Sequence, residues 1–152
     1  MPTIRQVIYI SKAADDFTVS ELRELAEVAA SKNKLRNITG ALLYIDKCFI
    51  QVIEGDEESI ADLLARLETD PRHHAIRIIS DHKQESRYFA DWSMGLISPP
   101  DEEKPKVLKE LRTVSGTSGD EHAAPTITPL PHTVAMMQRL YETDSILQQA
   151  RR

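Results

Sequence analysis

Hydrophobic positions in the first part of the chain follow two different periods. The run IRQVIYIS, residues 4–11, is rich in Ile and Val and contains no breaker, which predicts a strand buried on both faces. Apolar residues then recur at helical spacing, and Thr18 followed three positions later by Glu21 fits a capping box. We therefore predict a helix from Thr18 to about Asn33. Its apolar positions are Leu22, Leu25, Ala26, Ala29 and Ala30.

Two further apolar runs, 41–45 and 48–54, are separated only by Asp46 and Lys47, which predicts a tight antiparallel hairpin. Side chains alternate between the two faces of a strand, and in the second run both sets are largely apolar. One set is Phe49, Gln51 and Ile53, and the other is Cys48, Ile50 and Val52. Neither face of this strand can be left in water.

A second helix is predicted after Asp56, and Pro71 disfavours its continuation. Its apolar face consists of Ile60, Leu63, Leu64 and Leu67. Two more runs, 75–80 and 92–97, have the composition of strands. The order is therefore strand, helix, strand, strand, helix, strand, strand, which predicts an α+β, ferredoxin-like βαββαββ domain over residues 1–98.

Right-handed crossovers place both helices on the same face of such a sheet, so the opposite face needs another cover. We assign that cover to residues 99–152, a helical extension packed on the same domain, or to a partner subunit. Residues 107–111 form a short amphipathic stretch, 115–125 are typical of a loop, and a last helix is predicted over 133–149. The residues predicted to point inward are Val107, Leu108, Leu111, Met137, Leu140 and Tyr141.

Composition narrows the class of protein without naming a function. The 152 residues suit one domain, and 19 Lys and Arg against 24 Asp and Glu give a net charge of -5, which argues against a nucleic-acid partner. The single Cys48 cannot form an internal disulfide and is interpreted as a small core residue. The chain has no apolar run of about 18 residues and no signal-peptide pattern, so we expect a cytoplasmic protein away from membranes.

Gln51 is the residue that needs a chemical explanation. A single Gln in a strand more often faces solvent or binds a neighbouring backbone group. Its face, however, is shared with Phe49 and Ile53, and burying an unpaired amide costs about 1–3 kcal/mol. We therefore expect a polar partner for this side chain.

Several motifs occur in a fixed order: VIYIS, ITGALLY, FIQVIEG, DPRHH and FADWSMG. Together, over about residues 4–97, they resemble the BLUF family of flavin-binding blue-light photoreceptors, here of the short, single-domain type. The resemblance implies that the flavin ring lies between the two helices on one sheet face. FAD is the expected cofactor, with FMN or riboflavin as alternatives.

The resemblance also assigns the photochemistry. It implies that Tyr9 gives an electron and a proton to the excited flavin, after which the Gln51 amide is left rotated or tautomerised. Because a Gln amide both donates and accepts, it can bond a phenol at one end and the flavin at the other. The expected result is a modest red shift that reverts thermally, with no substrate turned over and no enzyme activity.

The remaining contacts come from the same resemblance. Asn33 is expected to bond the flavin O4 and N3 edge, with a helix C-cap as the alternative, and Lys32 stands where the family commonly has Asn or His. Arg66 is the expected phosphate partner. The full set of predicted cofactor contacts is Tyr9, Leu25, Lys32, Asn33, Phe49, Gln51, Ile53, Arg66, Leu67, Asp70, His73 and Met94.

Trp92 and Met94 are the predicted signal relay. They have the same parity in the predicted strand 92–97, and the family shows either one beside the glutamine. The signal is expected to pass through this strand and the C-terminal helices to a protein partner, in a protein that forms homo-oligomers.

Two other functions compete with this one. A ferredoxin-like acylphosphatase would use residues such as Arg5 and Asn37, and a flavin-free regulatory ligand-binding domain needs neither. The neighbours Ser80, Asp81 and His82 do not by themselves build a catalytic triad, and residues 72–74 are a weak metal hint without further ligands. We predict no metal.

Overall fold

Five strands form one sheet with two helices on each side. The computed structural model describes residues 3–71, 73–114 and 131–150, and the side chains of these except 73, 112–114, 131 and 142–150. The strands are β1 (Ile4–Ala13), β2 (Thr39–Ile45), β3 (Cys48–Gly55), β4 (His73–Gln84) and β5 (Gly95–Ile97). The helices are α1 (Val19–Leu35), α2 (Glu57–Glu68), α3 (Lys104–Val114) and α4 (Pro131–Ala150).

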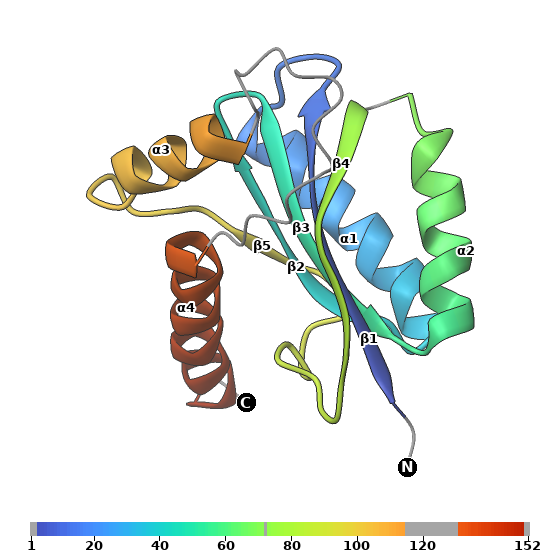
Figure 1. The fold of residues 1–152 in the computed structure, drawn as a ribbon. Coiled ribbons are helices and arrows are strands. Elements are labelled where there is room, and N and C mark those ends of the chain that lie inside the picture. The colour runs from blue at the N-terminus through green and yellow to red at the C-terminus, as the bar shows by residue number, and fades with distance from the viewer. Residues whose placement is uncertain (1–2, 72, 115–130, 151–152) are drawn as a thin grey trace.

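The sheet has the order β4-β1-β3-β2-β5, with α1 and α2 on one side and α3 and α4 on the other (Figure 1). The first four strands are antiparallel to their neighbours, and β5 is added parallel to β2. The predicted α+β, ferredoxin-like sheet with an extra strand is confirmed. In this arrangement β1 and β3 lie in the middle of the sheet.

Local sequence signals explain where the first two helices begin. The Thr18 side chain accepts a hydrogen bond from the Glu21 N–H, and the Glu21 carboxylate accepts one from the Thr18 N–H, as the predicted capping box requires. In α2 the Asp56 carboxylate caps the N–H of Ser59 in the same way. Helix α1 ends at Leu35 rather than at about Asn33, and its C-cap is Arg36.

The hairpin between β2 and β3 turns on Asp46 and Lys47. Both residues have positive φ, at 51° and 62°, which is the conformation of a two-residue turn whose twist matches its strands. The antiparallel pairing predicted from the two-residue spacing is confirmed.

The last two strands differ from their predicted ranges. Strand β4 is longer than 75–80 because it pairs with β1 from Ala13 to Ile4, with irregularities that include a positive φ at Ala75. Strand β5 is shorter than 92–97. The carbonyl of Trp92 accepts from Gly40 N–H at 2.9 Å and that of Ser93 accepts from the Asn33 side chain at 2.9 Å, so these residues are bonded outside a regular ladder.

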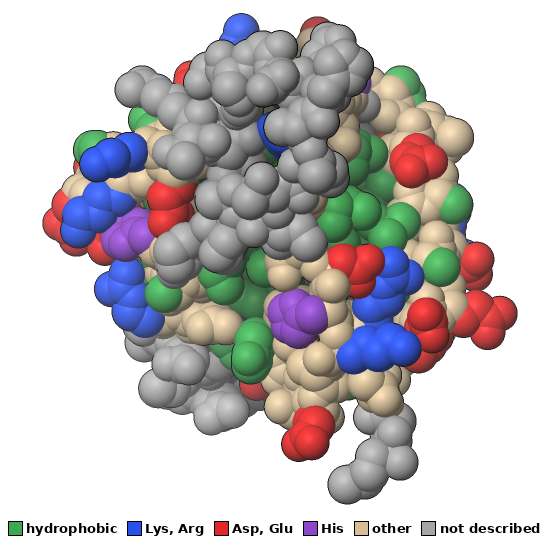
Figure 2. All heavy atoms as spheres, viewed as in Figure 1, with side chains coloured by type: hydrophobic (Ala, Val, Ile, Leu, Met, Phe, Trp, Pro, Cys, Tyr) green, Lys and Arg blue, Asp and Glu red, His purple; other side chains and the backbone are tan. Residues whose placement is uncertain are grey.

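Strand β4 is an edge strand, and charged side chains lie along it. Figure 2 shows Lys and Arg side chains beside Asp and Glu side chains over β1 and β4. The contacts include Arg5 with Asp81 at 2.7 Å and Lys83 with Glu57 at 3.9 Å. Charges on an edge strand disfavour pairing with another chain, so they protect this edge.

The two faces of the sheet carry separate apolar clusters. The first, here the tail-side cluster, joins strand residues such as Ile8, Ile10, Ile50 and Val52 to Val107, Leu111, Met136, Met137 and Tyr141 of the C-terminal helices. The second, the helix-side cluster, joins Val7, Phe49 and Ile53 to α1 and α2. The prediction that the C-terminal helices cover the opposite face is therefore confirmed. The predicted loop at 115–125 lies outside the described residues.

A side chain of α3 caps the first turn of α4. The Glu110 carboxylate accepts hydrogen bonds from the N–H of His132 and the N–H of Thr133, both at 2.8 Å, and from the Thr133 hydroxyl. The first N–H groups of a helix have no partner within it, so this contact satisfies them from another helix. The two C-terminal helices are thus joined by a polar contact as well as by the apolar cluster.

Cys48 lies half-buried against the tail-side cluster. Burial raises the pKa of its thiol, and the nearby Asp46 raises it further. A thiol held protonated in this way behaves as a small apolar side chain, in agreement with its interpretation as a core residue.

A chain ending at residue 100 is expected to melt at a lower temperature and to bind a hydrophobic dye or dimerise. The truncation uncovers Ile8, Ile10, Ile50 and Val52, and burial of each such side chain contributes about 1.5–3 kcal/mol. Thermal unfolding and light scattering measure both effects. A truncated monomer with the melting temperature of the full chain would show that the cover of this face contributes no stability.

Candidate functional site

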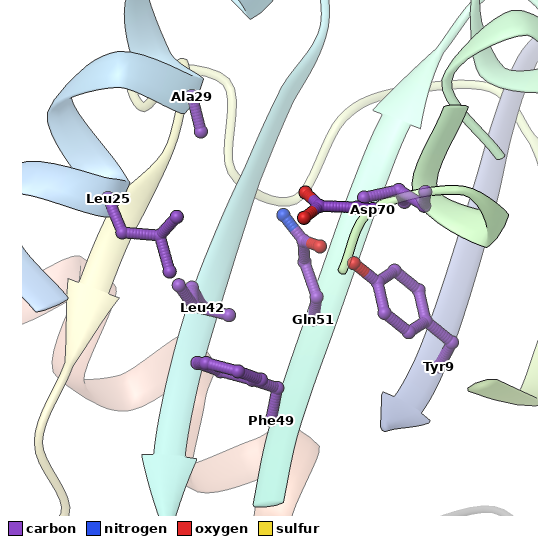
Figure 3. A pocket seen from close by; sticks show the side chains of 8 residues that line it. Tyr9, Leu25, Ala29, Leu42, Phe49, Gln51 and Asp70 are labelled. Carbon is purple, nitrogen blue, oxygen red and sulfur yellow. The ribbon is translucent and has the colours of Figure 1, made fainter. Parts of the chain in front are cut away.

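Two adjoining pockets lie between α1, α2 and the middle of the sheet. The first, here the sheet pocket, has an empty volume of about 450 Å³ with its mouth included (Figure 3). It is lined by Tyr9, Leu25, Ala29, Leu42, Phe49, Gln51, Leu67 and Asp70. The second, the helix pocket, has about 970 Å³ and is lined by Leu25, Val28, Ala29, Lys32, Asn33, Arg36, Gln51, Leu63, Arg66, Leu67, Thr69 and Asp70. The two pockets share Leu25, Ala29, Gln51, Leu67 and Asp70, and an apolar hollow with a few convergent polar groups suits a small-molecule ligand.

Tyr9 and Gln51 are direct partners across the β1–β3 ladder. Both are almost fully buried, with 2% and 8% of their surface exposed, and both line the sheet pocket. Their polar ends and the Asp70 carboxylate point toward one another in Figure 3. The fold therefore brings a phenol, an amide and a carboxylate together at the floor of an apolar cavity.

The Gln51 amide makes a weak contact with the far side of the site. Its Nε2 donates to the Met94 sulfur at 3.4 Å. A thioether is a weak acceptor, whereas a Gln amide can donate twice and accept at its oxygen. This contact alone leaves Gln51 with capacity for a stronger partner in the pocket.

Aromatic packing holds one wall of the sheet pocket in place. The Phe49 ring packs against Phe17 with centroids 5.4 Å apart and against Tyr44 at 5.2 Å. The Tyr44 hydroxyl also accepts from the Phe17 N–H at 3.4 Å. The three rings of this wall come from the residue before the N-cap of α1, from β2 and from β3. A flat ligand would meet a packed aromatic surface there.

Asn33 faces the helix pocket and is also tied to the chain after β4. Its side chain is buried, and its Nδ2 donates to the Ser93 carbonyl at 2.9 Å. Its own carbonyl accepts from Arg36 and Ile38 N–H at 3.0 and 2.9 Å. The alternative that Asn33 is the helix C-cap is wrong, because α1 continues to Leu35 and Arg36 is the cap.

Basic side chains lie at the rim of the helix pocket. Lys32 and Arg66, both predicted contacts, are exposed there, and Arg36 adds a third cation. Because the net charge of the chain is -5, three cations around one opening are a local departure from its overall charge. This rim suits an anionic group outside an apolar interior.

Some predicted contacts lie elsewhere. Ile53 is fully buried in the helix-side cluster and lines neither pocket, and Met94 reaches Gln51 without lining either one. His73 begins β4, and its side chain lies outside the described residues. The predicted contacts that line a pocket are Tyr9, Leu25, Lys32, Asn33, Phe49, Gln51, Arg66, Leu67 and Asp70.

Sequence reasoning missed several lining residues. These are Val28, Ala29, Arg36, Leu42, Leu63 and Thr69. Two of them carried a usable signal: Ala29 lies one helical turn after Leu25, and Leu42 pairs with Gln51 in the β2–β3 ladder.

Trp92 and Met94 lie on opposite faces of the sheet. Met94 belongs to the helix-side cluster, whereas Trp92 packs against the tail-side cluster, with its ring 4.7 Å from that of Tyr141 at 86°. The expectation of equal parity is wrong because residues 92–94 are not in β5. Gly95 permits this geometry, since a Cβ there would lie 2.0 Å from the Trp92 ring.

Arg5, one of the residues proposed for an acylphosphatase, is paired with a carboxylate rather than left to bind a phosphate. The Arg5 guanidinium donates to both Asp81 carboxylate oxygens, at 2.9 and 2.7 Å, and this contact lowers the pKa of Asp81. Within the described residues, no three His, Cys, Asp or Glu side chains gather as metal ligands. None of the helices in the described parts of the chain combines the length and hydropathy that a membrane span needs.

The sequence model of the BLUF family, "Sensors of blue-light using FAD", matches residues 4–95. The chain belongs to the BLUF family. BLUF domains bind flavin, and both described pockets lie within the matched segment.

Curated relatives include photoactivated adenylate cyclase subunit beta of Euglena gracilis, 32% identical over 93 residues. That match covers 60% of this chain and 11% of the relative, so the chain spans about a tenth of its length. A bacterial light-regulated adenylyl cyclase structure has a TM-score of 0.65 at 27% identity, over 75% of this chain and 34% of that one. The dark-state structure of BlrB, a BLUF protein, shares the fold with a TM-score of 0.67 at 24% identity, over 94% of this chain and 98% of that one.

Filling the site from α1 is expected to prevent flavin binding. Ala29 lines both pockets, so Ala29→Leu places three more carbons where the ligand would lie. The flavin affinity should fall about tenfold or more, since overfilling a packed site costs about 1–3 kcal/mol. Flavin content of the purified protein and titration of the apoprotein measure the effect.

Ala65→Leu is the matched control, because Ala65 is exposed on α2 and lines neither pocket. Its flavin affinity should equal that of the wild type. Equal affinity of Ala29→Leu and wild type would place the flavin elsewhere.

Proposed function

We propose that this chain is a blue-light sensor that holds a flavin between α1 and α2, with Tyr9 and Gln51 as its photochemical pair. The observation that carries the proposal is the direct pairing of these two buried side chains at the floor of the sheet pocket. The wall residues Leu25, Ala29 and Phe49 give an apolar surface for a flat ring. The amides of Gln51 and Asn33 give polar partners for its edge.

We infer that the flavin is FAD. Lys32, Arg36 and Arg66 at the rim of the helix pocket would hold its phosphate groups, because guanidinium and ammonium groups pair strongly with phosphate. The description of the family also names FAD. FMN would use fewer of these cations, and riboflavin, which has no phosphate, would use none.

The chemistry of the site depends on protons held by the protein. A bound flavin supplies absorption of blue light and an excited state that takes up an electron. Tyr9 holds a phenolic proton on its oxygen, and Gln51 offers both an acceptor oxygen and the donor Nε2. Movement of the Tyr9 proton would reverse the donor and acceptor ends of the Gln51 amide, by rotation or by tautomerisation. Tyr9 would give up an electron to the excited flavin together with this proton, and both return to Tyr9, so the cycle consumes nothing.

The same change would alter the contact between Gln51 and Met94. In the structure Nε2 donates to the Met94 sulfur, and we assign this arrangement to the dark state. An amide turned to present its oxygen has no proton for that sulfur, so the contact would be lost. Met94 immediately precedes β5, and the change would therefore reach residues 92–97.

We propose that the output lies on the tail side. The Tyr141 hydroxyl of α4 donates to the Asp91 carboxylate at 2.9 Å and accepts from the Asp91 N–H at 3.0 Å. The Tyr141 ring packs on Trp92 and Phe89. Residues 1–98 would act as the sensing domain and 99–152 as the extension that passes the signal to a protein partner, in a homo-oligomer.

Purified protein is expected to be yellow and to show a reversible red shift of its flavin absorption under blue light. Tyr9→Phe removes the phenolic proton and Gln51→Ala removes the amide, so either change should abolish the shift. Absorption spectra before and after illumination test this. Tyr44→Phe, the same change at a neighbouring strand position, should keep it.

Other results would favour the competing functions. A colourless protein that hydrolyses acyl phosphates would support the hydrolase, and a colourless inactive one the regulatory domain. A red shift retained in Tyr9→Phe would rule out Tyr9 as the proton donor.

Tyr141→Phe is expected to keep the red shift but to lose the effect of light on α4. The variant lacks both hydrogen bonds to Asp91 while keeping the ring. Hydrogen exchange in α4, compared between dark and light, measures the coupling. Tyr88→Phe, at a half-exposed position before Phe89, is the control and should respond to light like the wild type. Equal light responses in Tyr141→Phe and wild type would exclude these hydrogen bonds from the output.

A further inference from the structure

Glu54 is a fully buried carboxylate that the proposed photochemistry does not use. It lies three residues after Gln51 in β3, on the opposite side of the sheet, with 0% of its surface exposed. A buried charge is costly unless it is paired and hydrogen-bonded. A carboxylate kept in such a position therefore calls for an explanation.

Five donors converge on this carboxylate. Two are the consecutive backbone N–H groups of Tyr88 and Phe89, one on each oxygen, both at 2.8 Å. The side chains of Gln6, Thr39 and Gln84 supply the others, at 3.0, 3.2 and 2.9 Å. Glu54 thus joins β1, β2 and the end of β4 to the segment that follows.

That segment, residues 85–94, is here called the connection. Arg87 holds it a second time, donating to the Glu54 carbonyl and the Thr39 hydroxyl, both at 3.0 Å, and to the Asn37 carbonyl at 2.6 Å. The side chains and backbone of β2 and β3 therefore fix the connection at residues 87–89. Its first part has little freedom to move while these contacts remain.

A series of hydrogen bonds leads from this anchor to the photochemical pair. The Phe89 carbonyl accepts from Trp92 N–H at 3.1 Å, and the Trp92 carbonyl accepts from Gly40 N–H at 2.9 Å. At the far end of the connection, the Met94 sulfur accepts a hydrogen bond from the Gln51 amide. The connection that carries Met94 is therefore fixed by the anchor at residues 88 and 89, by the contact of Trp92 with Gly40 and, next to Met94, by the bond from the Asn33 side chain to the Ser93 carbonyl.

We propose that Glu54 is a positioning residue for the light reaction, because its carboxylate holds the connection where Met94 meets Gln51 and Trp92 stays on the tail side. The inference rests on the proposed function. Only a carboxylate meets the geometry: both oxygens must accept, one from each of two adjacent N–H groups. An amide would present its NH₂ to one of them and push the connection away.

The test is the dark recovery of the flavin spectrum in Glu54→Gln, measured on the flavin-loaded full chain. When the connection is released, the Met94 sulfur moves away from Gln51. It can then no longer accept the hydrogen bond that the Gln51 amide donates in the dark arrangement. Recovery is therefore expected to slow by about two- to tenfold, the effect of one hydrogen bond on a rate. Trp92 is the only tryptophan of the chain, so its emission should shift to longer wavelength as the ring loses its packing.

Two comparisons separate positioning from general stability. Val52→Ala changes a fully buried residue on the same strand and the same face. It should lower the melting temperature but leave the recovery rate and the Trp92 emission unchanged. In a Met94→Ala background, Glu54→Gln should cause no further change in recovery, because its effect passes through Met94.

The inference is overturned if Glu54→Gln recovers at the wild-type rate, if Val52→Ala slows recovery equally, or if the Glu54 effect persists without Met94. Arg87→Met tests the second anchor should Glu54→Gln not fold. It should slow recovery through Met94 in the same way, and a wild-type rate would count against the inference. A wild-type protein with no red shift would instead contradict the proposed function itself.

Discussion

The pairing of Tyr9 with Gln51 depends on the register between β1 and β3, and that register is held by polar pairs on both faces of the sheet. Gln6 pairs with Glu54 in the same ladder, and its amide donates to that carboxylate on the tail side. A slip of one residue would move Gln51 into the tail-side cluster and Glu54 among the residues under α1 and α2. Each would then be buried without its partners, at a cost of about 1–3 kcal/mol or more. The Gln6–Glu54 pair therefore fixes the position of the Tyr9–Gln51 pair.

Local signals were sufficient to predict most of the fold. The capping box at Thr18 and the two-residue hairpin at Asp46 and Lys47 are contacts between near neighbours, so the pattern contained them. The need to cover both faces of β3 predicted where the C-terminal helices lie. Strand β5 was predicted too long because the hydrogen bonds of residues 92 and 93 go to Gly40 and Asn33, far away in the sequence.

The site was predicted less completely, because its walls come from separate elements. The family resemblance supplied Tyr9 and Gln51, whereas Val28, Arg36 and Thr69 became visible only when α1 and α2 were placed on either side of one pocket. The alternation of side chains along a strand could not place Trp92 and Met94 on different faces, because residues 92–94 do not lie in a strand. Glu54 carried the same signal as Gln51, a polar residue in an apolar strand, and that signal could have singled it out.

The energies of the contacts explain why the connection has to carry the signal as a unit. An amide bonded to a thioether contributes no more than the usual 0.5–1.5 kcal/mol or so of a hydrogen bond, which shifts a two-state equilibrium by about tenfold at most. A change from 1:99 to 99:1 requires about 5.5 kcal/mol. Loss of the Met94 contact alone cannot supply this.

The other contacts of the connection add to it. The Trp92–Tyr141 ring pair adds about 0.5–1.5 kcal/mol, and a hydrogen bond to the Asp91 carboxylate adds about 1.5–3 kcal/mol. Only when the contacts of residues 91–94 change together does the total approach what a switch needs. A rigid anchor at residues 88 and 89 makes such a joint change possible.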